Sequence, residues 1–382
     1  MSKLYKKEDR GCAESICLVI MKTKIIIVDS VKGGCGKTTI SLKNVIRAFE
    51  ESEKEREEKH CKKNDTDDTK KNPIKVCLVD FDLLGSSMET FLTGKPTIDS
   101  KTEKEREDEV PISDILDPGI TSGNNTQGLR FKFQKKSVLY LNDYFNGSAP
   151  NYLEFLNHVL IVNESLEEQY RFDLLMSNPH QEQKNMFKVK AENQYIEQLD
   201  YNYFRTKIIK LIEMLNFAEY THIIFDMPPN SDSYTDILFD ILYQHQSPFS
   251  KECSIETELL VVSSLDVAHF NANLEWLKVQ SENCNWKRVF LYEREFRLVM
   301  NNLVDYERFH GKTAKLINLL GTRLQAYDDA MKFQHILKEI YYYDYDENTA
   351  LSATTDRGIV FSKWKMKKMS RLRIEGKNNE DD

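Results

Sequence analysis

The feature that most constrains this sequence is a glycine-rich turn between a strand-like run and a helix-like run. Residues 24–29 (KIIIVD) are apolar, and residues 32–39 read Lys-Gly-Gly-Cys-Gly-Lys-Thr-Thr. Apolar residues then recur at helical spacing over 40–49. Glycines let the backbone curl so that successive N–H groups point inward, and a helix that begins there adds the positive end of its dipole. The segment therefore predicts a phosphate-binding loop at the start of a helix.

Further strand-like runs alternate with helix-like stretches along the chain. This alternation predicts an α/β fold with a mostly parallel, twisted sheet and helices on both faces. Several runs are continuously apolar, as expected of strands that are covered on both faces. The expected strands are 24–29, 75–80, 171–176, 222–226, 258–263 and 295–301, with shorter ones at 138–141 and near 338–343.

Composition excludes several classes of protein. The chain has 382 residues, enough for one large α/β domain or two smaller ones, and 40% of them are hydrophobic. Its apolar runs are far shorter than the roughly 20 residues of a membrane-spanning helix, and no signal peptide is evident at its start. Seven cysteines without a regular framework fit reduced thiols, so a cytoplasmic protein is expected.

One position departs from the ordinary phosphate-loop pattern. A glycine is expected at position 31, where this chain has Val31, and a second lysine, Lys32, precedes the glycine pair. This arrangement resembles the deviant Walker A motif of the ParA/MinD superfamily of P-loop ATPases. The resemblance implies an ATP-dependent homodimer in which Lys32 contacts the ATP bound by the partner subunit.

The same loop supplies the nucleotide contacts that the resemblance implies. Lys37 would reach the β- and γ-phosphate oxygens, and the hydroxyl of Thr38 would bind Mg²⁺. ATP and Mg²⁺ are therefore the expected cofactors. The expected nucleotide-binding residues of the loop are Lys32, Gly33, Gly34, Cys35, Gly36, Lys37, Thr38 and Thr39.

Two later segments resemble the carboxylate motifs of the superfamily. In VCLVDFDLLGSS (76–87), strand alternation would place Asp80 and Asp82 on one face at the carboxyl end of the sheet. By the resemblance, Asp80 lies near the metal and Asp82 orients the attacking water; two capping carboxylates are the alternative. In HIIFDMPPN (222–230), Asp226 resembles a Walker B carboxylate, and the prolines after it resemble a nucleotide-sensing switch. The expected catalytic residues are Lys32, Lys37 and Asp82, and the expected metal-binding residues are Thr38, Asp80 and Asp226.

The pocket for the base is less completely defined. Asn301 and Asn302 follow a strand-like run at the place where the superfamily has an asparagine that contacts the adenine ring. Either residue could take this role, and an ordinary turn is the alternative. The superfamily also has a proline-containing segment near the base, whereas residues 341–358 contain no proline. One wall of the expected pocket is therefore undefined.

The resemblance spans about residues 23–360, which defines one expected ATPase domain. Residues 1–22 are an expected N-terminal extension, and residues 361–382 an expected tail that is basic and then acidic. Charged insertions are expected at about 51–72 and 99–110, because these segments have too little apolar surface to bury. We interpret them as a solvated helix extension or loops, with a docking element as the alternative.

Members of the superfamily have different biological functions, so the ATPase motifs alone do not identify the cargo. The leading prediction is a ParA-like ATPase that positions or segregates cargo, with DNA bound through basic residues such as those of 363–377. A vestigial ATPase that acts as a regulatory binding module is a further alternative. An iron–sulfur carrier is disfavoured because no Cys-x-x-Cys pair occurs.

The second function class is a MinD-like organiser at a membrane surface. It depends on apolar residues that share one side of a helical wheel over 361–376, namely Phe361, Trp364, Met369 and Leu372. The expected partners are thus a second copy of the chain, DNA or a membrane surface, and an activating protein. The expected location is the cytoplasm, in association with the nucleoid or a membrane.

Overall fold

The computed structural model describes most of the expected ATPase domain. The described residues are 22–62, 74–86, 88–93, 128–163, 169–179, 198–229, 233–243, 248–249, 254–264, 267–282, 296–303, 340–352, 359–362 and 364–368. The expected N-terminal extension up to residue 21 and the insertion at 99–110 lie outside them.

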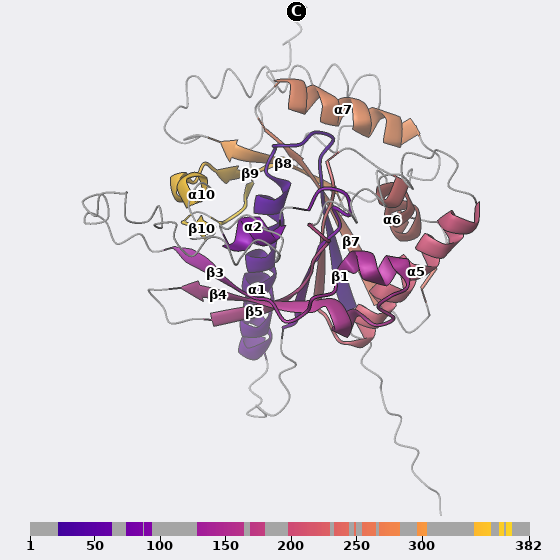
Figure 1. Ribbon diagram of the computed structural model, residues 1–382. Coiled ribbons are helices and arrows are strands. Elements are labelled where there is room, and N and C mark those ends of the chain that lie inside the picture. Colours follow the sequence, from indigo (N-terminus) through magenta and orange to yellow (C-terminus); the bar gives the residue numbers. More distant parts are fainter. Residues whose placement is uncertain are drawn as a thin grey trace, which may run out of the picture.

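In the part of the chain that the structure describes, one sheet of 11 strands forms the centre (Figure 1). Its strands are β1 (Lys22–Asp29), β2 (Val76–Asp80), β3 (Leu129–Gln134), β4 (Leu156–Asn163), β5 (Gln169–Leu175), β6 (His222–Asp226), β7 (Ser254–Ser263), β8 (Phe296–Leu303), β9 (Ile340–Asp344), β10 (Val360–Phe361) and β11 (Lys367–Lys368). Their order is β10-β3-β4-β5-β2-β6-β1-β7-β8-β9-β11. The central run from β5 to β9 is parallel, and antiparallel strands extend both edges. The predicted α/β fold with a mostly parallel sheet is confirmed.

Helices cover both faces of the sheet (Figure 1). The helical elements are α1 (Lys37–Lys62), α2 (Met88–Thr93), α3 (Leu141–Asn146), the 3-10 turn η4 (Tyr152–Phe155), α5 (Gln198–Phe217), α6 (Ser233–Tyr243), α7 (Val267–Glu282) and α10 (Glu347–Ser352). Apolar residues of α1 and α2 belong to the core on one face, and those of α3, α5 and α6 belong to the core on the other.

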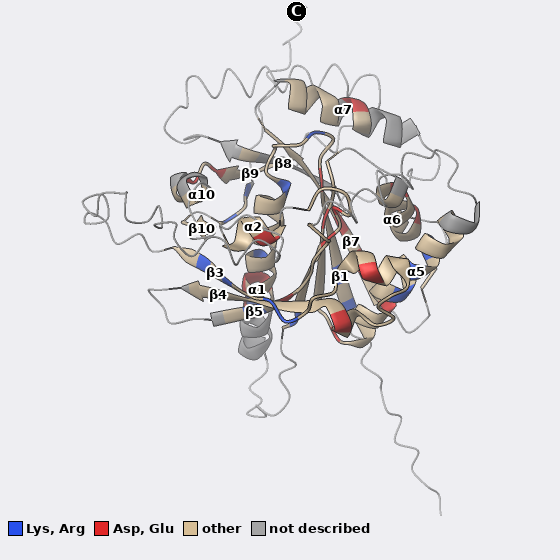
Figure 2. Ribbon diagram, in the orientation of Figure 1, with Lys and Arg blue, Asp and Glu red and all other residues tan. Residues whose placement is uncertain are grey.

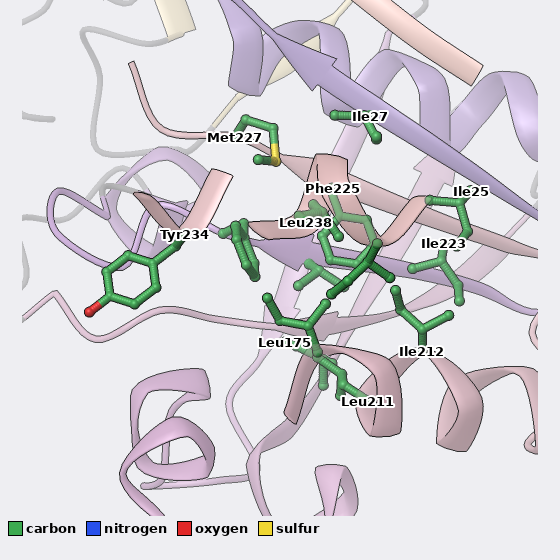
Figure 3. Packing of buried hydrophobic residues seen from close by; sticks show 14 of the residues in the cluster. Ile25, Ile27, Leu175, Leu211, Ile212, Ile223, Phe225, Met227, Tyr234 and Leu238 are labelled. Carbon is green, nitrogen blue, oxygen red and sulfur yellow. The ribbon is translucent and has the colours of Figure 1, made fainter. Parts of the chain in front are cut away.

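The alternation of side chains along β1 explains the two cores. Ile25 and Ile27 point into one core, whereas Ile26 and Val28 point into the other, and all four are fully buried. Figure 3 shows the first core. There, side chains of the central strands meet those of α5 and α6, including Ile25, Ile223, Phe225, Leu211, Ile212 and Leu238.

The registers of the central strands place their carboxyl ends side by side. Asp80 at the end of β2 pairs with Asp226 at the end of β6, and Asp226 pairs with Val28 near the end of β1. Because α1 follows β1 after a short loop, its N-terminus lies at this edge of the sheet. The edge therefore collects residues that are far apart in the chain.

The expected strand at 138–141 is wrong. Leu141 begins helix α3 instead, and the helix start is stabilised locally. The carboxylate of Asp143 accepts a hydrogen bond from the N–H of Tyr140 at 2.8 Å, and Gly147 closes the helix in the left-handed conformation, with φ of 88°. These capping interactions outweigh the strand propensity of the run.

Two long antiparallel strands, β3 and β4, were not predicted from the sequence. In β3, buried Leu129 and Phe131 alternate with exposed Arg130 and Lys132, because only one face of this part of the sheet packs on a core. Only every second residue of such a strand needs to be apolar, whereas the central strands are continuously apolar, so the sequence pattern is harder to recognise.

The structure places the start of the expected C-terminal tail within the sheet. Val360–Phe361 pairs with β3, and Lys367–Lys368 pairs with β9. Phe361 is fully buried, and the indole N–H of Trp364 donates to Glu50 at 2.8 Å. The amphipathic-helix interpretation is wrong for these residues, since they pack in the domain instead of forming a helix. Helix α1 runs to Lys62, so the start of the 51–72 segment is a helix extension.

Candidate nucleotide site

The glycine-rich loop lies between a strand and a helix, as its sequence predicts. It connects the end of β1 at Asp29 to the start of α1 at Lys37. Gly34 and Gly36 have φ angles of 81° and 87°, which L-residues with a side chain rarely adopt. The first N–H groups of any α-helix have no acceptor within the helix, so this turn can present N–H groups to an anion.

The two lysines of the loop have different environments. Lys37, at the helix start, is only 8% exposed, whereas Lys32 is exposed together with Gly33 and Gly34. A buried ammonium at a helix start suits a bound phosphate, and an exposed one suits contact with a second molecule. The thiol of Cys35 is buried and lies 3.5 Å from the carbonyl oxygen of Lys32.

The start of α1 contacts the expected Walker B carboxylate directly. The hydroxyl of Thr38 donates to Oδ2 of Asp226 at 2.8 Å, and the hydroxyl of Ser41 donates to Oδ1 at 2.9 Å. Burial raises the pKa of Asp226 to about 6, although both hydroxyls and the charge of Lys37 act in the opposite direction. Residues 188 positions apart thus meet at one point of the site.

Asp80 lies beside Asp226 and is more strongly perturbed. Burial raises its pKa to about 8, and the negative charges of Asp226 and Asp82 add to the effect. Its carboxylate accepts hydrogen bonds from the hydroxyl of Ser86 and from the N–H of Ser177, the latter at 3.2 Å. Without a bound cation, burial and the neighbouring charges thus favour the protonated form of Asp80.

Asp82 occupies a tight turn directly after β2. The N–H of Leu83 donates to the carbonyl oxygen of Phe81 at 2.9 Å, and the N–H of Gly85 donates to the carbonyl oxygen of Asp82 at 3.4 Å. A Cβ on Gly85 would lie 2.9 Å from Oδ2 of Asp82, so the glycine leaves room for this carboxylate. Asp82 is half-buried.

Asn301 lies against the glycine-rich loop. Its amide nitrogen donates to the carbonyl oxygen of Cys35 at 2.9 Å, and a Cβ on Gly36 would lie 2.1 Å from that nitrogen. Its Oδ1 is buried and has no hydrogen-bond partner among the described residues. Asn302 also belongs to β8, and its side chain lies outside the part that the structure describes.

Several polar residues at this edge were not singled out from the sequence. Asn273 of α7 is one: its Oδ1 accepts from the N–H of Val31 at 3.0 Å, and its amide nitrogen donates to Val262 at 3.0 Å. Only Ser41 carried a sequence signal, because it lies one helical turn after Thr38. Ser86 follows Asp80 within the 76–87 segment, whereas Asn142, Ser177 and Asn273 come from distant segments.

The oxygen groups at this edge fit a hard cation shared with phosphate. Within the described ranges, no cluster of three or more His, Cys, Asp or Glu residues could hold a metal by itself. A Mg²⁺ ion typically takes one or two protein oxygens and obtains its other ligands from phosphates and water. Thr38 and Asp226 supply such a pair.

The described residues contain no helix that is long and apolar enough to cross a bilayer. No protein-family model matches the chain, and no curated protein matches its sequence. Solved structures similar to it include a plasmid partition protein from Borrelia burgdorferi, at 15% identity over 74% of this chain and 80% of that chain, with a TM-score of 0.36. An iodide-soaked crystal of a plasmid partition protein from the same organism gives 16% identity, 76% and 87% coverage, and a TM-score of 0.36.

Proposed function

We propose that this protein is a Mg²⁺-dependent, ParA-like ATPase that closes into a dimer around ATP and uses hydrolysis to position cargo, in the leading case DNA. The observation that carries the proposal is the contact between Thr38 and Asp226 beside the buried Lys37. A hydroxyl at the helix start, a strand-end carboxylate and a lysine in the loop form the set that a nucleoside triphosphate with Mg²⁺ requires.

The residues of the site support ATP as its nucleotide. Lys37 and the loop N–H groups would bind the phosphates, and Thr38 with Asp226 would hold Mg²⁺, which neutralises phosphate charge when it is bound. Asn301 contacts the same loop through the carbonyl oxygen of Cys35, and its unpartnered, buried Oδ1 would accept a hydrogen bond from the 6-amino group of adenine if the side chain turned toward the base. Guanine has an acceptor at that position, so the same oxygen would disfavour GTP.

In the proposed hydrolysis, a water oxygen forms a bond to the γ-phosphorus, and the bond from that phosphorus to the bridging oxygen of ADP breaks. The bridging oxygen keeps the electron pair, and the proton lost by the water passes to the released phosphate or to solvent. Asp82 orients the water and accepts its hydrogen bond. The buried Lys37 contacts the phosphates within the same subunit. The exposed Lys32 contacts the phosphates held by the partner subunit, which couples ATP binding to dimer formation.

An exposed basic face supports DNA as the cargo. Lys132 of β3 and Arg171 of β5 flank Leu160 of β4 in the sheet register, and both are exposed. Arg171 also contacts His158 at 2.8 Å and lies 3.8 Å from the carboxylate of Asp173. Figure 2 shows Lys and Arg in blue on β3. Exposed cations on a sheet face can neutralise phosphates of a duplex. By contrast, Phe361 and Trp364 pack in the domain, which removes half of the apolar set on which the membrane alternative depends.

The test is binding of the Asp82→Ala protein to plain duplex DNA with ATP, with ADP and without nucleotide, over a series of salt concentrations. Asp82→Ala should retain the ATP dimer because it removes only the water-orienting carboxylate. We expect ATP-dependent binding that weakens steeply with salt. If the Asp82→Ala protein binds no DNA under all of these conditions, DNA as the cargo is contradicted. If the wild type hydrolyses no ATP in the same assays, the proposed ATPase activity is contradicted.

A matched pair of variants locates the DNA contact. Lys132→Gln removes a charge from the basic sheet face, and Lys54→Gln removes one from exposed Lys54 on α1. The first should reduce the slope of log affinity against log salt by about 1, and the second should leave it unchanged.

A further inference from the structure

Helix α3 contributes a buried asparagine that joins two loops of the nucleotide site. Asn142 is fully buried, and its amide nitrogen donates to the carbonyl oxygen of Leu83 at 3.2 Å. Its Oδ1 accepts from the N–H of Asn178 at 2.7 Å. One side chain therefore bridges the turn that follows β2 and the segment that follows β5.

The segment after β5 is itself attached to the other side of Asp82. The N–H of Ser177 donates to the carboxylate of Asp80 at 3.2 Å, and its hydroxyl donates to the carbonyl oxygen of Asp80 at 2.5 Å. The N–H of Leu141, the first residue of α3, donates to Met176 at 2.8 Å. Asp80 and Leu83, which precede and follow Phe81 and Asp82, are thus both hydrogen-bonded: Asp80 to the segment after β5, and Leu83 to α3.

We propose that Asn142 is a positioning residue for Asp82. It acts by fixing the carbonyl of Leu83, so that the turn presents the Asp82 carboxylate at one constant place relative to the glycine-rich loop. Without the amide donor, the buried carbonyl of Leu83 loses its partner, and the turn can relax toward water. The inference rests on the proposed function, because it assigns a role in the same hydrolysis.

Asn142→Asp is the discriminating substitution because it keeps the shape of the side chain. The new carboxyl can still accept from Asn178, but when ionised it cannot donate to Leu83 and it places two acceptors face to face. When protonated, it can donate again. Turnover relative to the wild type should therefore be highest at low pH and fall as the carboxyl ionises.

The chain offers a matched control in Asn157. It is also fully buried, its Oδ1 accepts from the N–H of Lys136 at 2.9 Å, and its amide nitrogen donates to Phe155 at 3.3 Å. These contacts join β4 to the loop after β3, and none of them involves the turn that carries Asp82. Asn157→Asp therefore introduces the same buried carboxyl outside the proposed catalytic machinery.

The experiment measures kcat, the KM for ATP and ATP affinity of the three proteins from about pH 6 to pH 9. For Asn142→Asp we expect kcat to fall on the order of 10- to 100-fold at high pH, with ATP affinity within about twofold of the wild type. Its kcat ratio to the wild type should decrease with rising pH, whereas the ratio for Asn157→Asp should stay flat. Asn142→Ala should show the loss of kcat without the pH dependence, which covers the case in which the charged variant fails to fold.

Equal kcat ratios for Asn142→Asp and Asn157→Asp at every pH, in a wild type that hydrolyses ATP, would overturn the positioning role alone. A parallel loss of ATP affinity and kcat in Asn142→Ala would also overturn it, since that pattern indicates general disruption of the site. A wild type that binds and hydrolyses no ATP would instead overturn the proposed function, and this inference with it.

Discussion

Asp80 and Asp226 are direct neighbours across the parallel strands β2 and β6, and both are buried. Two carboxylates so close together cannot both ionise easily without a cation, and burial raises the pKa of each. The pair therefore favours a bound positive charge at this edge of the sheet, where Lys37 also lies. Stability without nucleotide should depend on pH for the same reason.

Asp80→Asn should stabilise the nucleotide-free protein, and more so at higher pH. The folded-state pKa of about 8 lies above the ordinary value of 3.8, so between these values the folded state retains a proton that the unfolded state has released. The free energy of unfolding of the wild type thus decreases as pH rises through this range, by up to ~1.4 kcal/mol per pH unit. Chemical denaturation at pH 5 and pH 8 measures the effect. If the stability difference between the variant and the wild type is larger at pH 5 than at pH 8, the raised pKa of Asp80 is contradicted.

Lys37→Ala and Lys32→Ala should separate ATP binding from dimer formation. Lys37 is buried at the start of α1, so its loss should weaken ATP binding at least about 10-fold. Lys32 is exposed, so its loss should leave ATP binding of one subunit nearly unchanged while abolishing the ATP-dependent dimer. Nucleotide titration together with sedimentation distinguishes the two. Dimer formation by Lys32→Ala at the wild-type ATP concentration would refute contact in trans.

Gly36→Ala and Gly34→Ala form a matched pair in the glycine-rich loop. Both positions have positive φ, so each substitution costs roughly 1–2 kcal/mol of backbone strain. Only at position 36 would the new methyl group collide with Asn301, at 2.1 Å, whereas at position 34 nothing lies within 4 Å. We expect Gly36→Ala to lower the thermal unfolding temperature further and to lose ATP binding, as measured by calorimetry. Identical behaviour of the two variants would mean that Asn301 does not support the loop.

Gly85→Ala should reduce turnover without reducing stability. Gly85 has no backbone requirement for glycine, but a Cβ there would lie 2.9 and 3.0 Å from the two carboxylate oxygens of Asp82. The carboxylate is the mobile end of a side chain, so it should move aside at little cost in folding energy. Steady-state hydrolysis should fall on the order of 10-fold or more, with ATP affinity retained. Wild-type kcat in this variant would argue against the role of Asp82.

The sequence was sufficient for the central part of the fold. The buried stretches of parallel strands such as β1 and β6 are apolar runs, and the positive φ angles after β1 need glycine at Gly34 and Gly36. Both signals are local, because they depend on what one short segment can bury or which backbone angles it can adopt. The half-covered strand β3 and the capped helix α3 were missed or misassigned because a partner segment or a cap decided them.

Within the candidate site, the sequence alone pointed to Lys37, Thr38, Asp80, Asp82 and Asp226, and the tertiary structure decided how they are held. Parallel strands must end at one edge, so strand-end carboxylates gather there whatever the rest of the chain does. The bridges from Asn142 to Leu83 and from Asn301 to Cys35 join positions 59 and 266 residues apart. No spacing along the chain encodes such contacts. They exist because packing brings two distant backbone carbonyls within reach of buried amides, where each group needs a hydrogen-bond partner.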